Sequence, residues 1–223
     1  MATTAAEFWV KFAAANPVPQ TSVSHFSALP WTRKYIDDPE YTLVPTYSRT
    51  PKPNGEDHFY GATLNNPNTI PQFLTLQRPG SQTFRTDRSS SPQTGSGGLS
   101  AVALSQRPDC VCLVQLGHEG LNGHPSTAHG GIVCALLDES MGIVMMLHRR
   151  SVAASKPVES CYTANLNTNF RVPVNTPDAV VVKCWLLKQE GKRFFLRSQI
   201  VNKQETVLAE ANALWIVTSM NRL

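Results

Sequence analysis

The segment HGGIVCALLDESMG, residues 129–142, combines an apolar helical pattern with two acidic residues at its centre, Asp138 and Glu139. A lone carboxylate on a buried helix costs several kcal/mol unless another group pairs with it or a reaction uses it. Partial burial also raises the pKa of a carboxyl group, which makes it a better general base. The position of these acids therefore indicates a candidate acid–base site.

Two glycines, Gly130 and Gly131, stand at the entrance of this expected helix. Backbone N–H groups in a first helical turn have no acceptor within the helix, and they lie at the positive end of the helix dipole. Such groups can bind the oxygen of a polarised carbonyl, and glycine lets that oxygen approach closely. The alternative is that the glycines only allow the helix to pack tightly against a sheet.

The elements that would position these groups follow from the spacing of apolar residues. We expect one long helix from about residue 130 to 148, and strands at 70–76, 110–117, 161–170, 179–187, 193–202 and 207–218. A helix that is apolar on every side must be covered on every side. The pattern therefore predicts an α+β fold in which a curved antiparallel β-sheet wraps around a central α-helix, and a second subunit helps to cover that helix.

The N-terminal part of the chain has a different composition. Residues 4–15 are typical of a short helix, and residues 17–56 hold seven of the sixteen prolines and predict irregular structure. We therefore divide the chain into an N-terminal arm, residues 1–55, and a main domain, residues 56–223, in which the Ser- and Gly-rich stretch 79–99 forms a flexible loop. The arm should pack on the outer face of the sheet or roof the pocket through its apolar residues Phe8, Trp9, Phe12, Phe26, Trp31 and Tyr35.

Composition and charge argue against several classes of partner. The net charge of +4 and the pI near 8.9 come without a Lys/Arg run or a basic–aromatic alternation, so we expect no nucleic-acid partner. No uninterrupted apolar stretch of about 18 residues occurs, so we expect no membrane span. The N-terminus lacks the pattern of a signal peptide, and we therefore place the protein in the cytoplasm.

No metal and no cofactor are expected. His118, Glu119 and His124 lie near the expected helix start, but their spacing fits no helical or hairpin ligand set. The sequence has no G-x-S-x-G and no Gly-rich nucleotide loop, which argues against serine-hydrolase and Rossmann chemistry. The odd number of cysteines, five, fits buried thiols in a reducing compartment.

Two longer segments, GHPSTAHGGIVCALLDESMG (123–142) and YTANLNTNFRVPV (162–174), follow one another in the chain. Together they resemble the hotdog-fold acyl-CoA thioesterases, in the branch of the phenylacetate-type and 4-hydroxybenzoyl-CoA thioesterase-like enzymes. That branch has His-Gly-Gly at the helix start, an acid nine residues after the His, and a T-A-N-L-N strand that ends in a basic residue and Pro. The resemblance covers roughly residues 60–220, and the arm and the long second loop are similar to those of fungal members.

The resemblance implies hydrolysis of an acyl, aryl or polyketide-type thioester of CoA or of an acyl-carrier protein, in secondary metabolism. It makes Asp138 the general base or nucleophile, the Gly130 N–H the donor to the thioester oxygen, and Thr163 the hydroxyl that helps to hold the attacking water. His129 is expected to cap or orient the helix start. Glu139 lies about 100° further round the helix, so we interpret it as an outer group and keep its role as the real base as the alternative.

Three further residues are candidate substrate contacts. Gly131 shares the first helical turn, and Arg171 matches a basic position of the family that suits the phosphates of CoA. Asn122 is a weaker match, because some relatives have Asn six residues before the His, where this chain has Gly123.

Helix geometry constrains the oligomeric state. Gly130 and Asp138 are eight residues apart, which is about 12 Å along one helix. One thioester carbon cannot lie next to both groups, so the two must come from different helices. We therefore predict a homodimer, or a tetramer of two such dimers, in which each site uses Gly130 of one chain and Asp138 of the other.

Two other functions are compatible with this fold. The first is dehydration, isomerisation or cyclisation of a biosynthetic intermediate. Hotdog dehydratases set a catalytic His and an acid on or near the central helix, whereas His129 here is at the cap. The second is a non-catalytic, ligand-binding dimer, against which the presence of Gly130, Asp138 and Thr163 argues.

Overall fold

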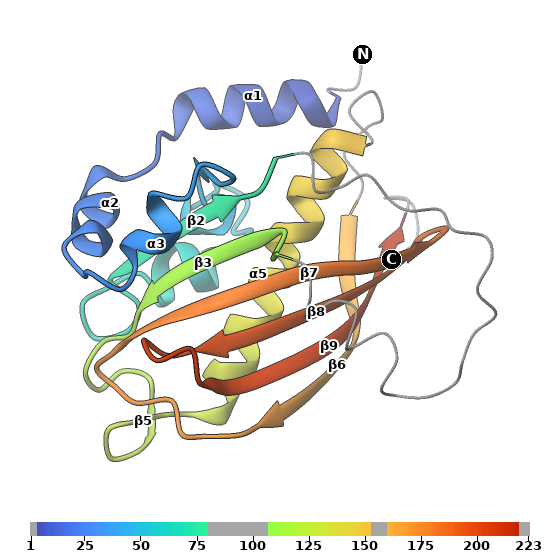
Figure 1. The fold of residues 1–223 in the computed structure, drawn as a ribbon. Coiled ribbons are helices and arrows are strands. Elements are labelled where there is room, and N and C mark those ends of the chain that lie inside the picture. The colour runs from blue at the N-terminus through green and yellow to red at the C-terminus, as the bar shows by residue number, and fades with distance from the viewer. Residues whose placement is uncertain (1–3, 80–106, 153–159, 219–223) are drawn as a thin grey trace.

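The computed structural model describes residues 4–79, 107–152 and 160–218 (Figure 1). The expected flexible loop at 79–99 falls almost wholly on residues outside these ranges. The elements are, in order, α1 (Ala5–Ala15), α2 (Gln20–Ser27), α3 (Arg33–Ile36), β1 (Thr42–Val44), the 3-10 turn η1 (Tyr47–Arg49), the π-helical turn η2 (Phe59–Thr63), β2 (Gln72–Gln77), β3 (Cys110–Gln115), β4 (Asn122–His124), β5 (Thr127–Ala128), α5 (Gly130–Val152), β6 (Ser160–Phe170), β7 (Ala179–Glu190), β8 (Arg193–Val201) and β9 (Val207–Thr218).

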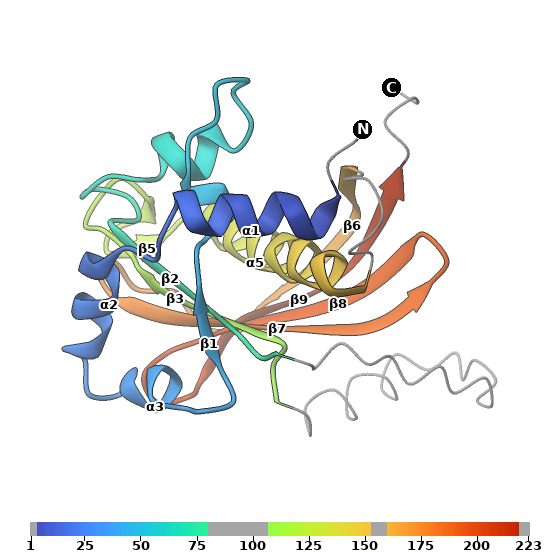
Figure 2. The ribbon, with the colours of Figure 1, turned by 90° about the horizontal axis from the view of Figure 1, so that it is seen from above.

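Seven strands form one antiparallel sheet in the order β1-β2-β3-β7-β8-β9-β6 (Figures 1 and 2). Helix α5 packs against one face of this sheet and contacts β3, β6, β7, β8 and β9. The side chains at the centre of that contact are at most 1% exposed, among them Leu136, Leu137, Met141 and Met145. The predicted α+β hotdog architecture, an antiparallel sheet around one central helix, is therefore confirmed.

Helix α5 is long and apolar because it fills the core. Over Gly130–Arg149 its mean hydropathy is 1.7, and by length and composition it is the one helix of the described residues that could cross a membrane. Half of this stretch is buried inside the fold, and a core helix meets the same criterion. The prediction that no segment spans a membrane is not contradicted by this criterion, and burial against the sheet accounts for the apolar composition.

Local sequence explains where α1 begins. The Thr4 hydroxyl accepts a hydrogen bond from the Glu7 N–H at 3.3 Å, and Glu7 Oε2 accepts one from the Thr4 N–H at 3.0 Å, which is a capping box. The helix then lies beside α5 (Figure 2), and its Trp9 is 3% exposed. Helix α1 therefore covers part of the side of α5 that the sheet leaves open, a contact that the sequence did not lead us to predict for the arm.

The rest of the arm is more regular than its prolines suggest. Helix α2 packs against β2, and β1 pairs with β2 as the first strand of the main sheet. Phe26 of α2 is fully buried on the sheet face opposite α5, in a second core with Leu74, Leu76, Val111 and Leu113. The prediction of irregular structure over 17–56 is therefore wrong for the short elements α2 and β1, because packing on the sheet stabilises elements that local propensity does not favour.

Most boundaries lie close to those predicted. Strand β9 agrees with the sequence pattern at both ends, whereas β2 begins at Gln72 because Pro71 has no N–H for strand pairing. Helix α5 continues past residue 148 to Val152. Strand β7 runs to Glu190, three residues beyond the predicted end, since it pairs along its length with β8.

Candidate active site

The start of α5 is fixed by His129. Its Nδ1 accepts a hydrogen bond from the Gly131 N–H at 2.9 Å, and its carbonyl oxygen accepts one from the Ile132 N–H at 2.9 Å. This is the bonding pattern of a helix N-cap, in which a side chain satisfies one of the free N–H groups of the first turn. His129 therefore caps the helix, as expected.

The two glycines differ in what their N–H groups do. That of Gly131 is bonded to His129, whereas no acceptor is found for that of Gly130 within the described ranges. The Gly131 N–H is therefore not free to bind a substrate in this structure, because His129 already accepts its hydrogen bond. A Cβ at Gly130 would meet only the Phe170 ring, at 3.5 Å, and one at Gly131 would lie 3.0 Å from His129 Nδ1. Neither contact involves sheet backbone, so close helix–sheet packing does not explain the pair.

Strand β6 runs beside α5 in the opposite direction. The Thr163 hydroxyl donates a hydrogen bond to Asp138 Oδ1 at 2.8 Å, and the Cys134 thiol donates one to Thr168 Oγ1 at 3.6 Å. The Phe170 ring lies next to Gly130 at the far end of this contact. Gly130, Cys134 and Asp138, which are four residues apart on one face of α5, thus contact successive positions along β6. Gly130 and Asp138 lie at opposite ends of this contact.

The Asp138 carboxyl has the properties of a base. It is partly buried, and this burial raises its pKa, while the hydrogen bond from Thr163 lowers the pKa in the opposite direction. No ion pair to Asp138 is found in the part of the chain that the structure describes. The alternative in which a charged group pairs with this acid for structural reasons is therefore not supported.

A cavity of about 400 Å³ opens at Asp138. Helix α5 contributes Ala135, Asp138 and Glu139, and the segment before and within η2 contributes Gly55, Asp57, His58, Phe59 and Tyr60. The interpretation of Glu139 as an outer group is therefore wrong, since it lines the same cavity as Asp138. The Glu139 side chain leaves the helix at a different angle from that of Asp138, as expected. Residues of the segment 55–60, which is distant in sequence, nevertheless cover both acids.

Glu139 is also strongly perturbed. Burial raises the pKa of its carboxyl to about 7, with further raising by Asp57 and Asp138, against the lowering effects of the Ser48 hydroxyl and Lys52. An acid with a pKa in this range changes its protonation state near neutral pH. Sequence reasoning missed this contribution of residues 48–60, because the segment has no motif and comes to α5 only through the tertiary fold.

The two remaining predicted substrate contacts, Asn122 and Arg171, are both hydrogen-bonded to other side chains of the protein. Asn122 Oδ1 accepts a hydrogen bond from the Thr176 hydroxyl. A Cβ at the neighbouring Gly123 would lie 2.9 Å from His129 Cα, so an Asn at that position would not fit this conformation. Arg171 donates through Nε and Nη2 to Glu210 Oε1, at 3.2 and 2.7 Å, and its positive charge is partly neutralised there.

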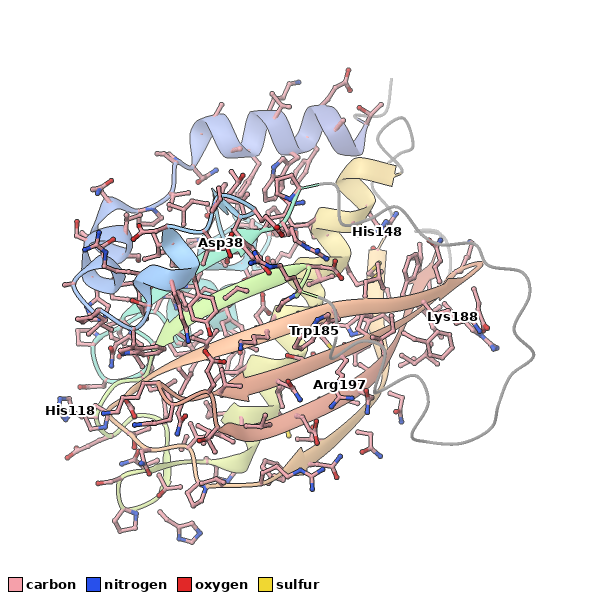
Figure 3. All side chains as sticks on the ribbon, viewed as in Figure 1. Asp38, His118, His148, Trp185, Lys188 and Arg197 are labelled. Atoms are coloured by element: carbon pink, nitrogen blue, oxygen red, sulfur yellow. The ribbon has the colours of Figure 1, made fainter. Side chains whose placement is uncertain are left out.

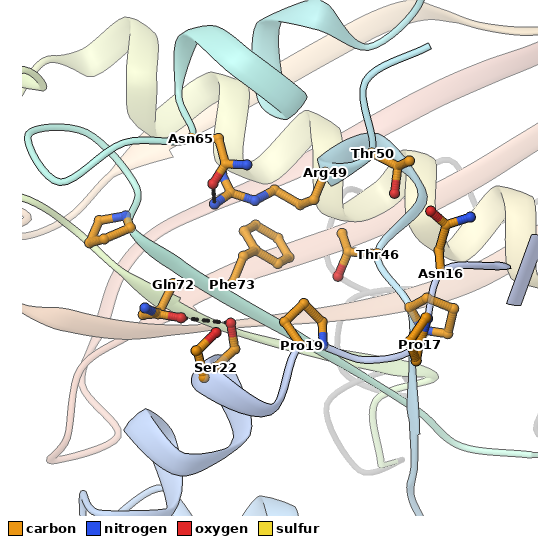
Figure 4. Close-up of a pocket in the computed structure, with 13 residues that line it drawn as sticks. Asn16, Pro17, Pro19, Ser22, Thr46, Arg49, Thr50, Asn65, Gln72 and Phe73 are labelled. Carbon is orange, nitrogen blue, oxygen red and sulfur yellow. Dashed lines mark hydrogen bonds between the residues drawn. The ribbon is translucent and has the colours of Figure 1, made fainter. Parts of the chain in front are cut away.

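A second cavity, of about 260 Å³, lies between the arm and β2 (Figure 4). Its cation, Arg49, donates to the carbonyl oxygens of Tyr60 and Leu64 at 3.2 Å and of Ile70 at 2.7 Å. Arg49 thus holds the segment that forms the roof over Asp138, and its donors are used by the protein itself. This cavity supports the active site structurally and is not a second candidate for chemistry.

The histidines near the start of α5 do not form a metal-binding cluster within the described residues. His118 lies at the edge of the molecule (Figure 3), and Glu119 and His124 are exposed like it. Within the described residues no group of three His, Cys, Asp or Glu side chains could hold a metal ion.

Comparison with known proteins places part of this chain beside a known family. Residues 126–209 match the family model of the thioesterase superfamily, and this segment contains His129, Gly130, Asp138 and Thr163. This part of the chain is therefore similar to the thioesterase superfamily.

Individual relatives are more distant or only partly aligned. The bovine (Bos taurus) acyl-coenzyme A thioesterase THEM4 is 35% identical over 107 residues, which are 48% of this chain and 40% of that protein. The chain thus spans about two fifths of that relative. Verlamelin biosynthesis protein B from Lecanicillium sp is 24% identical over 224 residues, 90% of each chain. Among solved structures, the E. coli PaaI protein from the phenylacetic acid degradation operon has a TM-score of 0.42 at 17% identity, over 49% of this chain and 72% of that one.

Proposed function

We propose that this protein is a thioester hydrolase that acts on an acyl thioester of CoA or of an acyl-carrier protein. The observation that supports this most directly is the partly buried Asp138, hydrogen-bonded by Thr163 and open to a cavity, within the segment of the thioesterase superfamily. The name of the THEM4 relative supports CoA as the carrier. The relative named for verlamelin biosynthesis supports a substrate from a biosynthetic pathway.

In the proposed reaction, Asp138 removes a proton from a water molecule that the Thr163 hydroxyl helps to hold. The water oxygen attacks the thioester carbon, and the negative charge that forms on the carbonyl oxygen is stabilised by the Gly130 N–H at the positive end of α5. The carbon–sulfur bond then breaks, so a carboxylic acid and a free thiol leave.

We further propose that each site is shared between two chains. Within one chain, Gly130 and Asp138 lie at opposite ends of the α5–β6 contact, about 12 Å apart along the helix. Strand β6 is also the edge of the sheet, and an edge strand can pair with another chain. Large apolar side chains are exposed on it and just after it: Tyr162 at 46%, Phe170 at 59% and Val172 at 45%. A homodimer with antiparallel central helices would cover this edge and bring Gly130 of one chain to Asp138 of the other.

A second candidate function rests on His58. This side chain lines the same cavity as Asp138 and Glu139, so a histidine and an acid face one ligand space. Hotdog dehydratases use such a pair. A dehydratase would convert a hydroxyacyl thioester to an unsaturated thioester and release no thiol, so the product distinguishes the two candidates.

The test is thiol release from short, long and aromatic acyl-CoAs, followed with a thiol-reactive dye and by mass spectrometry of the products. Wild-type protein should release CoA from at least one of them, and Asp138→Asn should not do so at a comparable rate. Intact thioesters throughout would contradict hydrolysis, and dehydrated thioesters would favour the second candidate.

A further inference from the structure

The cavity beside Asp138 is unusually polar for an acyl pocket. Three of its eight lining residues carry carboxyl groups, Asp57, Asp138 and Glu139. Ligand pockets are usually lined mainly by apolar side chains with a few polar groups for orientation. Here the apolar lining is limited to Phe59 and Ala135 beside the ring of Tyr60.

These polar groups are only partly satisfied by the protein. Asp57 forms an ion pair with Lys52, and Asp138 accepts from Thr163. Glu139 has no ion pair in the described parts of the chain. The Tyr60 side chain also lines the cavity, but its hydroxyl is itself buried within the protein.

A plain alkyl chain would fit this space poorly. It would displace water from the carboxyl groups and return no hydrogen bond, at a cost of several kcal/mol for a polar group. An acyl group with a hydroxyl or ammonium group close to its thioester would instead donate to Glu139. Its remaining hydrocarbon would contact Phe59 and Ala135.

We propose that this site selects acyl thioesters that carry a hydrogen-bond donor, a hydroxyl or an ammonium group, near the reacting carbonyl, with Glu139 as the specificity-determining residue. This inference rests on the proposed function for the identity of the substrate. Of the cavity's three carboxyl groups, Asp57 lies outside the matched thioesterase segment, and Asp138 and Glu139 lie within it. A site that hydrogen-bonds its substrate discriminates strongly against an analogue without that group, because its polar side chains are then left unpaired.

The experiment compares octanoyl-CoA, 3-hydroxyoctanoyl-CoA and 3-aminooctanoyl-CoA. Their dissociation constants are measured by calorimetry with Asp138→Asn, in which turnover is suppressed, and their kcat/KM values with the wild type. We expect at least one substituted thioester to bind about tenfold or more tightly than octanoyl-CoA, the effect of roughly 1.4 kcal/mol. Tighter binding of the amino compound assigns the preference to charge, and tighter binding of the hydroxy compound assigns it to a neutral hydrogen bond.

Variants locate the preference in the cavity. Glu139→Met, placed in the Asp138→Asn background, should reduce the affinity for the preferred compound and leave that for octanoyl-CoA nearly unchanged. Thermal unfolding would show that the fold of this variant persists. The control is Tyr47→Phe, an arm tyrosine that does not line this cavity, and its preference should equal that of the parent.

Equal affinities for all three thioesters, or the tightest binding for octanoyl-CoA, would overturn the inference. Release of CoA from octanoyl-CoA would in that case leave the proposed hydrolysis intact. Conversely, tighter binding of a substituted thioester that depends on Glu139 supports the inference even where the wild type releases no thiol, and only the proposed function then fails.

Discussion

The Thr163 hydroxyl on the edge strand β6 donates a 2.8 Å hydrogen bond to Asp138 Oδ1 on the central helix, across 25 residues of sequence. Burial raises the pKa of Asp138 and this bond lowers it. The strand therefore both orients the proposed base and sets the pH range in which it is ionised.

Thr163→Val should keep the shape of the side chain and remove this bond. The bond favours the charged carboxylate, so its loss leaves Asp138 with a higher pKa and protonated up to a higher pH. The rising limb of the pH–kcat profile should move to higher pH, and kcat should fall about tenfold, as for loss of a hydrogen bond to a charged group. Thr168→Val, on the same strand but beside Cys134, is the control and should keep the wild-type profile.

Asp138→Asn should fold and lower kcat by roughly a hundredfold or more, the usual scale for a lost general base. Glu139→Gln, at the next position, should cost far less in kcat, because a hydrogen-bonding side chain is kept and the base is untouched. Steady-state kinetics on one acyl-CoA would measure both. Full activity of the Asp138 variant would remove that residue from the mechanism, and a larger loss at Glu139 would make Glu139 the base.

Two inactive variants should complement each other if the sites are shared. Asp138→Ala removes the acid, and Gly130→Pro removes the N–H at the first helical position, where proline is tolerated. In a mixed dimer one site carries both changes and the other carries none. An equal mixture, refolded together, should regain about a quarter of wild-type activity, since half of the dimers are mixed and each has one sound site.

This complementation requires that both variants fold and exchange subunits, which native mass spectrometry of the mixture would show. A mixture that contains mixed dimers and stays inactive would rule out the shared site and require both groups to act within one chain.

The arm should be necessary for stability because it forms the second core. Phe26→Ala, at a fully buried position between α2 and the sheet, should lower the free energy of unfolding by about 3–5 kcal/mol. Val10→Ala, at a position of α1 that is 67% exposed, should change it by less than about 0.5 kcal/mol. Urea unfolding would compare the two. A small effect at Phe26 would mean that the arm packs only weakly on the sheet.

The sequence alone determined the parts of this protein whose signals are local. The apolar pattern gave α5 and the strands from β6 to β9 almost at their observed bounds, because periodicity reflects which faces an element must bury. The segment from His129 to Asp138 and the strand around Thr163 identified the candidate site and its likeness to thioesterases from sequence alone. The capping role of His129 also followed, since a helix start needs an acceptor for its free N–H groups.

Only the tertiary structure decided what the rest of the chain does there. Helix α2 and strand β1 form because Phe26 and its neighbours bury against the sheet, and no local pattern records that gain. Glu139 points away from Asp138 on the helix, yet residues 55–60 close over both, so one cavity contains two acids. Gly131 and Gly130 are equivalent by sequence, but in the structure the His129 ring accepts a hydrogen bond from the Gly131 N–H. In each case the partner comes from a contact in space, which the periodicity of a single segment does not record.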